Sequence, residues 1–126
     1  MSALTNYAEE ALTKAVLGIA SHTSPGSTFL ALHTADPTEV GNVSEASGGS
    51  YARQTIAWSW NAGTGRAEST GDIVFSMPIG VYTHFSVKDA SSGGNTICKG
   101  TLQPAQSVST PGSVTIRAGN LSVAVD

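Results

Sequence analysis

Charged and aromatic side chains are scarce in this chain. Charged residues make up 12% of the 126 residues, aromatic residues make up 6%, and the net charge is -3 at pH 7. Lys and Arg are scattered singly, which argues against nucleic acid as a partner, because phosphate binding needs clustered basic residues. No apolar run reaches the roughly 18 residues of a membrane-spanning helix, and no basic segment precedes an apolar core as in a secretion signal. We therefore expect no nucleic-acid partner and no membrane.

Cysteine is almost absent. Cys98 is the single cysteine, which excludes an intrachain disulfide and fits assembly in a reducing cytoplasm. Cys98 lies between Ile97 and Lys99 in an expected strand, where a small buried hydrophobic side chain is commoner than a reactive thiol. No serine stands in a GxSxG context. The glycine-rich turn at residues 63–66 lacks the lysine and helix of a phosphate-binding loop.

Metal-binding patterns are absent as well. The three histidines are far apart, without the spacing of a zinc site, and they are His22, His33 and His84. Asp36, Glu39 and Glu45 lack the alternate-residue spacing of a calcium loop, so solvated loop carboxylates are the simpler interpretation. We expect no enzymatic activity, no metal, no cofactor and no small-molecule substrate.

The first 20 residues have the periodicity of a helix. Small and apolar residues recur at helical spacing and form one narrow stripe: Ala8, Ala11, Leu12, Ala15, Val16 and Ile19. Asn6 and Glu9 have the spacing of a capping box, and Glu10 and Lys14 form an i, i+4 pair on the polar face. The stripe predicts a helix that docks on a sheet or on another subunit.

The rest of the chain has the pattern of short strands. Val81, Thr83, Phe85 and Val87 alternate with polar residues, which predicts one buried strand face. The chain therefore predicts a mainly β fold, an antiparallel β-sandwich of jelly-roll type with seven or eight short strands and one N-terminal α-helix. The helix would occupy residues 1–22, as an attachment or capping element, and the sandwich residues 23–126.

Two segments between the strands carry further predictions. Residues 35–50 form a long polar loop, which predicts contact with a neighbouring subunit, although an Ω-like loop folded on its own domain is the alternative. Trp58 and Trp60 share one face of a strand with Ile56. Aromatic pairs of this kind more often fill a sandwich core than form a sugar platform, so we expect both tryptophans in the core.

Four segments resemble a family of small phage virion proteins. They are ALHTADPTEVG (31–41), EASGGSYARQTIAW (45–58), THFSVKDASSGGN (83–95) and AGNLSVAVD (118–126). Members of that family are known as tail fibre proteins, and some similar chains serve as capsid cement or decoration proteins. Ser86 and Lys88 stand where apolar residues are common in the family, which would alter an exposed strand face.

The resemblance implies a multicopy virion structural protein that is made in the host bacterial cytoplasm. A fibre normally has a long shaft or a separate attachment domain, whereas 126 residues hold one globular unit. We therefore predict a capsid decoration protein, a homotrimer that binds the major capsid protein and stabilises the head. A tail fibre or minor tail protein that is involved in host attachment, with tail proteins as partners, is the alternative. The predicted interface combines the helix stripe (Ala8, Ala11, Leu12, Ala15, Val16, Ile19) with loop residues Asp36, Pro37, Glu39, Glu45 and Tyr51.

Overall fold

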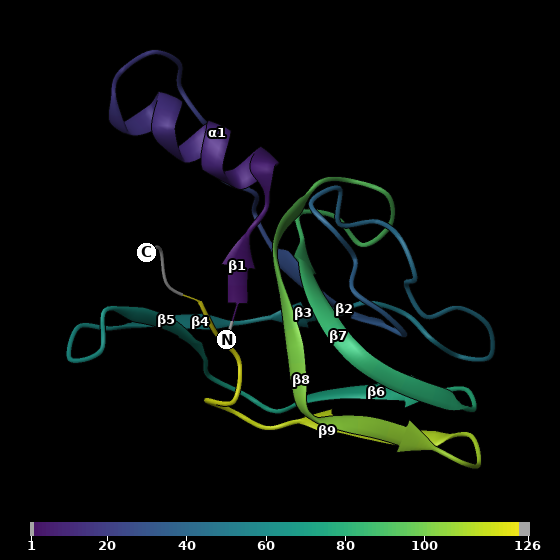
Figure 1. Cartoon of the computed structure of the whole chain (residues 1–126). Helices are drawn as coiled ribbons and strands as arrows, with labels where there is room; N and C mark the ends of the chain where they lie inside the picture. Colours follow the sequence, from purple (N-terminus) through teal and green to yellow (C-terminus); the bar gives the residue numbers. More distant parts are fainter. Residues whose placement is uncertain (1, 124–126) are drawn as a thin grey trace.

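A computed structural model describes residues 2–123. The chain forms short strands and one helix, α1, which extends away from the strands (Figure 1). In chain order the elements are β1 (Ser2–Leu4), α1 (Asn6–Val16), β2 (Thr28–His33), β3 (Gln54–Ile56), β4 (Trp58–Asn61), β5 (Arg66–Ser69), β6 (Ile73–Met77), β7 (Gly80–Lys88), β8 (Thr96–Val108), β9 (Gly112–Ile116) and β10 (Ser122–Val123). The predicted mainly β, antiparallel fold with one N-terminal helix is confirmed. Ten strands are described instead of seven or eight.

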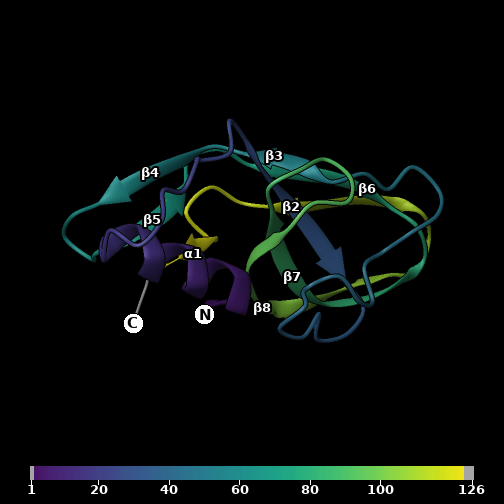
Figure 2. The same ribbon diagram turned by 90° about the horizontal axis from the view of Figure 1, so that it is seen from above.

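The strands form three antiparallel sheets. The largest has the order β1-β8-β7-β2-β3, the second the order β10-β5-β4, and the third pairs β6 with β9. The β6 and β9 pair lies against one face of the largest sheet, while β4 and β5 extend to one side (Figures 1 and 2). This arrangement leaves the other face of the β2 and β7 pair to the long loop at residues 35–50.

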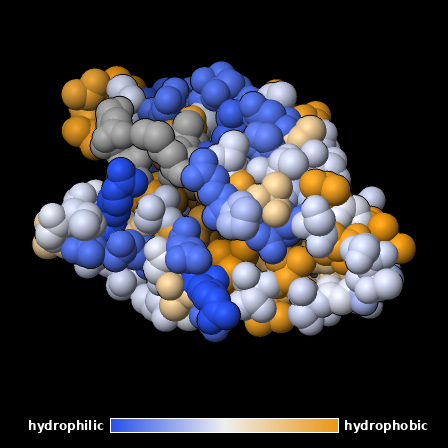
Figure 3. Space-filling model, turned by 60° about the horizontal axis from the view of Figure 1, so that its bottom comes forward, coloured by the Kyte–Doolittle hydropathy of each residue, from blue (hydrophilic) through white to orange (hydrophobic). Residues whose placement is uncertain are grey.

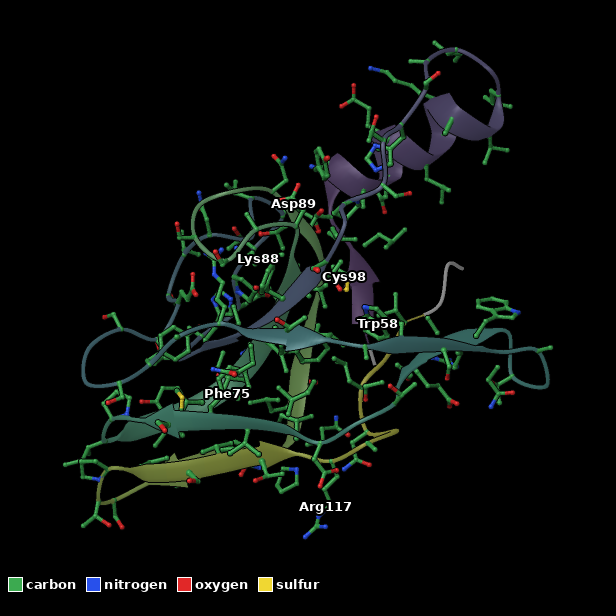
Figure 4. All side chains as sticks on the ribbon, turned by 180° about the vertical axis from the view of Figure 1, so that it is seen from behind. Trp58, Phe75, Lys88, Asp89, Cys98 and Arg117 are labelled. Atoms are coloured by element: carbon green, nitrogen blue, oxygen red, sulfur yellow. The ribbon has the colours of Figure 1, made fainter. Side chains whose placement is uncertain are left out.

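The hydrophobic core lies between the largest sheet and the β6 and β9 pair. Phe75 is fully buried there and points from β6 toward the large sheet (Figure 4). Apolar side chains from both layers surround it: Leu30, Leu32, Ile56, Ile73, Met77, Tyr82, Phe85, Val87, Cys98, Val114 and Leu121. Burial of these side chains is the main driving force for folding, at about 1.5 to 3 kcal/mol for each large one.

The alternation predicted for β7 is interrupted near its start. The register of β7 against β8 shifts between Tyr82, which pairs with Gln106, and His84, which pairs with Thr101, so the extra residues of this irregularity lie in β8. Phe85 and Val87 are buried as expected, but Tyr82 is also buried and Val81 is exposed. His84 is half-buried, in agreement with the sequence. The predicted inward position of Val81 was wrong, because the alternation of buried and exposed side chains along β7 is interrupted between Tyr82 and Phe85.

The tryptophan strand is also interrupted. Ala57 separates β3 from β4, which pair with different neighbours, β2 and β5. Trp58 is half-buried, and its indole N–H donates to Thr28 Oγ1 at 2.8 Å. Trp60 is 68% exposed. The predicted core position was therefore wrong for Trp60, because β4 extends past the edge of the large sheet (Figure 1).

Candidate interaction surfaces

Helix α1 projects from the body on a short, well-anchored base. β1 pairs with β8 through Leu4 and Cys98. Thr5 follows and is fully buried; its N–H donates to Ile97 O at 3.0 Å, and its hydroxyl donates to Thr96 O. The first turn of the helix is thereby fixed to the large sheet, while the rest of α1 extends away from it (Figure 1).

The start of α1 differs from the predicted capping box. Thr5 is the N-cap residue and Asn6 is the first helical residue. No side chain caps the helix, because the Thr5 hydroxyl is already bonded to β8. The predicted pair of Glu10 and Lys14 is present as an exposed ion pair, and it lowers the pKa of the Glu10 carboxyl through the Lys14 hydrogen bond and charge.

The helix ends in a hydrophobic tip. Gly18 adopts a φ of 73°, which closes the last turn, and Ile19 N–H donates to Lys14 O at 2.8 Å. No residue of α1 is buried. In the stripe, Ala8 and Ala11 are half-buried, whereas Ala15 and the larger residues Leu12, Val16 (74% exposed) and Ile19 are exposed. Leu17, beside the stripe, is exposed as well. The exposed part of the stripe, from Leu12 onward, is therefore not covered by the described part of the chain.

The loop at residues 35–50, unlike the helix, is held on its own domain by hydrogen bonds. Thr34 N–H donates to Ser44 O at 2.9 Å, and Ala46 N–H donates to Leu32 O at 2.8 Å. His33 is fully buried beneath the loop. Its Nδ1 lies 2.8 Å from Val43 O, and its Nε2 lies 2.7 Å from Ser86 Oγ. Because a carbonyl only accepts, Nδ1 carries the proton and Nε2 accepts from the serine.

A buried lysine holds the middle of the loop. Lys88, on β7, donates from Nζ to Gly41 O and to Thr96 Oγ1, and Thr96 Oγ1 donates to Gly41 O at 2.9 Å. Lys88 is 1% exposed, and this burial lowers the pKa of its ammonium group. The expectation that Ser86 and Lys88 alter an exposed strand face was wrong, because the loop covers that face.

A half-buried ion pair closes the end of the loop. Arg53 donates from Nε and Nη2 to the two carboxylate oxygens of Glu45, at 2.9 and 2.8 Å, and from Nη1 to the carbonyls of Ala90 and Gly93. Tyr51 donates its hydroxyl to Glu45 at 2.8 Å. Burial alone would raise the Glu45 pKa, but these hydrogen bonds lower it overall. Glu45 is therefore a fixed partner, and its interpretation as a solvated carboxylate was wrong.

The predicted loop residues divide into two groups. Pro37 is buried, and Glu45 and Tyr51 face their own domain, where the Tyr51 ring stacks on Phe75 at 6.2 Å. Asp36 and Glu39 are exposed. Asp36 accepts hydrogen bonds from Thr38 N–H and from Lys99 Nζ at 2.8 and 3.0 Å, and both lower the pKa of its carboxyl. The structure brings Glu45 and Tyr51 together and does not bring the loop residues to the helix stripe.

Four buried polar side chains beneath the loop were not predicted as a group from the sequence: His33, Ser86, Lys88 and Thr96. One signal could have found them. In β2 and β7 these residues alternate with core residues, which places His33, Ser86 and Lys88 on the face opposite the core. A long polar loop that is ordered needs hydrogen-bond donors beneath it, and this face supplies them.

Metal-ligand clusters and a reactive cysteine are two possible kinds of chemical site among the described residues. No cluster of three or more His, Cys, Asp or Glu side chains there could hold a metal ion. Cys98 is buried, which raises the pKa of its thiol to about 12 and keeps it protonated. Between residues 2 and 123, no helix is long and apolar enough to span a membrane.

The sequence matches the family described as Podophage GP4 fiber I protein gp80 over residues 3–124. The chain belongs to this family. The match covers nearly the whole length, so the helix and the body both lie within it. The predicted resemblance to small phage virion proteins is confirmed. No curated protein matches the sequence.

Proposed function

We propose that this chain is a structural subunit of a podophage tail fibre. The observation that carries the proposal is the family match over residues 3–124, since the family is described as a fibre protein. A role in the virion also supports a non-enzymatic function, which would depend on the surfaces that bind other virion proteins. The size of the chain predicted a capsid decoration protein, but the family description favours a fibre.

The two surfaces described above suit a subunit that is assembled into a larger structure. The body is fixed by a buried core and by the covered polar layer beneath the loop. The helix, in contrast, offers its apolar stripe to solvent. An exposed apolar group on an otherwise well-packed domain is typical of a protein interaction site. The helix stripe is therefore the proposed assembly element.

The partners that follow from this proposal are other tail proteins and further copies of the chain. Low charge favours such contacts, because few charged groups must lose water. We retain the homotrimer as the proposed state, since phage structural proteins that surround a tail or form a fibre use cyclic symmetry. Among the predicted loop residues, Asp36 and Glu39 are exposed and remain available at such an interface, and Val40 and Val43 of the same loop are exposed as well.

The test is to locate the chain on the intact virion. A short epitope inserted at the exposed β4–β5 turn, residues 62–64, lies far from the helix. Antibody labelling followed by electron microscopy should place this epitope on the tail. A matched virion without the insertion serves as the control.

Labels on the head would overturn the fibre proposal and favour decoration. In that case virions that lack the chain should also release their genome at a lower temperature, because a ligand that binds only the assembled shell stabilises it. A fibre subunit should leave the release temperature unchanged.

A further inference from the structure

The N-terminal arm is attached to the body at its base (Figure 1). We call residues 2–20 the arm; they comprise β1, Thr5, helix α1 and the turn at the helix tip. Leu4 packs against the core and Thr5 is fully buried, whereas no residue of α1 is buried. The body therefore needs the strand of the arm to complete its edge at β8, but the helix contributes little to the packing of that body.

The linker between the arm and β2, residues 21–27, is held loosely. All of it except Pro25 is exposed, and no hydrogen bond joins it to the body among the described residues. It returns from the helix tip alongside α1 (Figure 1), where the His22 ring lies 6.4 Å from the ring of Tyr7. A hollow of about 280 Å³ lies between the linker and the start of β8 near Ile97. The linker therefore does not fix the arm to its own body.

A helix of this length gains most of its stability from packing. α1 has 11 residues, and isolated helices shorter than about 12 to 15 residues are marginal in water. Leu12, Val16 and Ile19 nevertheless face solvent. Figure 3 shows that the hydrophobic surface on the side that carries β6 and β9 is divided into separate areas among polar ones, which argues against a broad apolar contact between copies on that side. The arm is thus the part of the described chain whose packing is incomplete.

We propose that the arm is exchanged between copies, so that β1 of one chain pairs with β8 of a second chain. The site on β8 is already matched to this strand. The hydroxyl and the N–H of Thr5 donate to Thr96 O and Ile97 O, and Leu4 packs at the edge of the core. A second copy supplies the same strand, and exchange of an identical element is a low-cost route to assembly, because every contact of β1 is regained.

Exchange would place α1 and the linker between two bodies, because β2 stays with its own chain while β1 leaves. The helix would then lie beside a second chain, which the closed arrangement does not provide. Reciprocal exchange gives a dimer, and exchange passed on in one direction closes a ring, such as the proposed trimer, or continues as a filament. The inference rests on the proposed multicopy role in a fibre and adds the segment that joins the copies.

The pairing of β1 with β8 provides a direct test. Thr5 N–H donates to Ile97 O, so these two residues form a hydrogen-bonded pair, and the neighbouring pair of Leu4 and Cys98 is a non-hydrogen-bonded one. The Cα atoms of Leu4 and Cys98 should therefore lie about 4.5 Å apart, which a disulfide can bridge. Figure 4 shows Cys98 beside β1. Leu4→Cys would thus place a second thiol opposite the native one.

Two preparations are mixed at high concentration, refolded together from urea and then oxidised with copper phenanthroline. One carries Leu4→Cys with Cys98→Ala, and the other is the native chain, so neither holds both thiols of the pair. If the arm is exchanged, a disulfide joins one chain of each kind, and a dimer band appears in the absence of reductant. Oxidation must be prolonged, because burial raises the pKa of the Cys98 thiol to about 12.

Two controls accompany the mixture. Leu4→Cys in a chain that keeps Cys98 shows that the pair can be oxidised, and its disulfide should form mainly between chains. A disulfide confined to single chains, with no mixed dimer, would overturn the proposal. Ser59→Cys with Cys98→Ala, on exposed β4, is the matched control for random collision. It should give no mixed dimer with the native chain, because a buried thiol cannot be reached from the surface.

Shortening the linker gives an independent measurement by sedimentation. Residues 17–20 are hydrogen-bonded to the end of the helix, so residues 21–27 must return along α1, whose 11 residues are about 16 Å long. Deletion of residues 21–23 leaves residues 24–27, which reach at most about 14 Å. The closed arrangement would then need the helix to unwind. The deletion should therefore strengthen self-association at least about tenfold, with the helical signal retained in circular dichroism.

Replacement of residues 21–23 by Gly-Ser-Gly keeps the linker length and should leave self-association unchanged. A shortened chain that stays monomeric, with or without its helix, would overturn the proposal, since the arm would have stayed on its own body. This failure is distinguishable from failure of the fibre proposal, because exchange is measured on purified protein whereas the fibre role is decided by labelling the virion. Labels on the head together with a mixed dimer would support the exchange and overturn only the fibre role.

Discussion

The helix and the long loop differ in an unexpected way. Helix α1 is regular, yet none of its residues is buried. The loop at residues 35–50 contains no helix or strand, yet Pro37, Gly41 and Ala46 are buried within it. Hydrogen bonds from His33, Lys88 and Arg53 fix the loop to the body, directly or through Glu45. Local regularity and attachment to the body are therefore separate properties in this molecule.

The comparison separates an intramolecular role from an intermolecular one. The loop uses its polar groups within the chain, so its alteration should act first on stability. The helix has apolar groups that remain in water, so its alteration should act first on association. Substitutions in the two regions test this distinction.

Among the substitutions in the loop, Gly41→Ala should have the largest effect on stability. Gly41 has a φ of 77°, and an added Cβ would lie 2.3 Å from Thr96 Cβ. The strained backbone and the overlap together should cost about 3 kcal/mol of unfolding free energy. Urea denaturation followed by tryptophan fluorescence measures the loss.

Gly48→Ala provides the matched control in the same loop. Gly48 also has a positive φ, of 92°, but no atom lies within 4 Å of its added Cβ. Only the backbone cost should remain, at about 1 kcal/mol. Equal losses of unfolding free energy in the two variants would mean that Gly41 is not packed tightly against Thr96 of β8. The loop would then not be fixed to the body in the way described.

Arg53→Met should have the next largest effect. It leaves the half-buried Glu45 carboxylate with the Tyr51 hydroxyl and removes both donations to the Ala90 and Gly93 carbonyls. The loss of these bonds should cost about 2 kcal/mol. Lys14→Met, which breaks the exposed pair with Glu10 on the helix, is the matched change and should leave the unfolding midpoint in urea unchanged. A similar loss of unfolding free energy in Arg53→Met and Lys14→Met would mean that the loop and the helix contribute equally to stability.

Local patterns in the sequence were sufficient to predict the helix and most strands. The spacing of the helix stripe and the alternation of Phe85 and Val87 both depend on neighbours in the chain, and both are confirmed. The bulge near Tyr82 could not be read from the same alternation, because a register shift depends on the pairing strand, β8.

Burial was harder to predict than secondary structure. Trp60 is exposed and Lys88 is buried, which is the reverse of what an aromatic and a charged side chain predict. Both outcomes depend on segments distant in sequence: β4 passes the edge of the large sheet, and the loop covers β7. The sequence could therefore suggest that the helix and loop were special, but not which of them had its contacts inside the chain.

Acid should loosen the loop without a direct effect on the helix. Burial lowers the pKa of His33 below its ordinary value of 6.5, and Lys88 and Arg53 add to this, while the Val43 carbonyl and Glu45 oppose it. The folded chain thus binds a proton less readily than the unfolded chain. The stabilisation is complete above pH 6.5 and is lost as the pH falls toward the lower folded pKa, by at most about 1.4 kcal/mol per pH unit.

Urea denaturation between pH 7.5 and 5 measures this dependence. His33→Gln should be less stable at pH 7.5 but should show a flatter profile over the same range, because no group at that position titrates. If the profiles of both proteins have the same slope, His33 does not link the loop to pH.

The smallest effect on stability is expected from Ala15→Lys. Ala15 is an exposed residue in the last turns of α1, lysine is almost as good a helix former as alanine, and a positive charge suits the helix C-terminus. The free energy of unfolding should therefore change by less than about 0.5 kcal/mol. Ala31→Lys is the matched change in the body, where Ala31 is 0% exposed in β2, and it should prevent normal folding because a large charged group cannot fit there. Both variants are compared by urea denaturation and by near-ultraviolet circular dichroism. A loss of several kcal/mol in Ala15→Lys would mean that the stripe packs on its own chain, and the helix would then lose its role as the part of the molecule reserved for contacts with other copies.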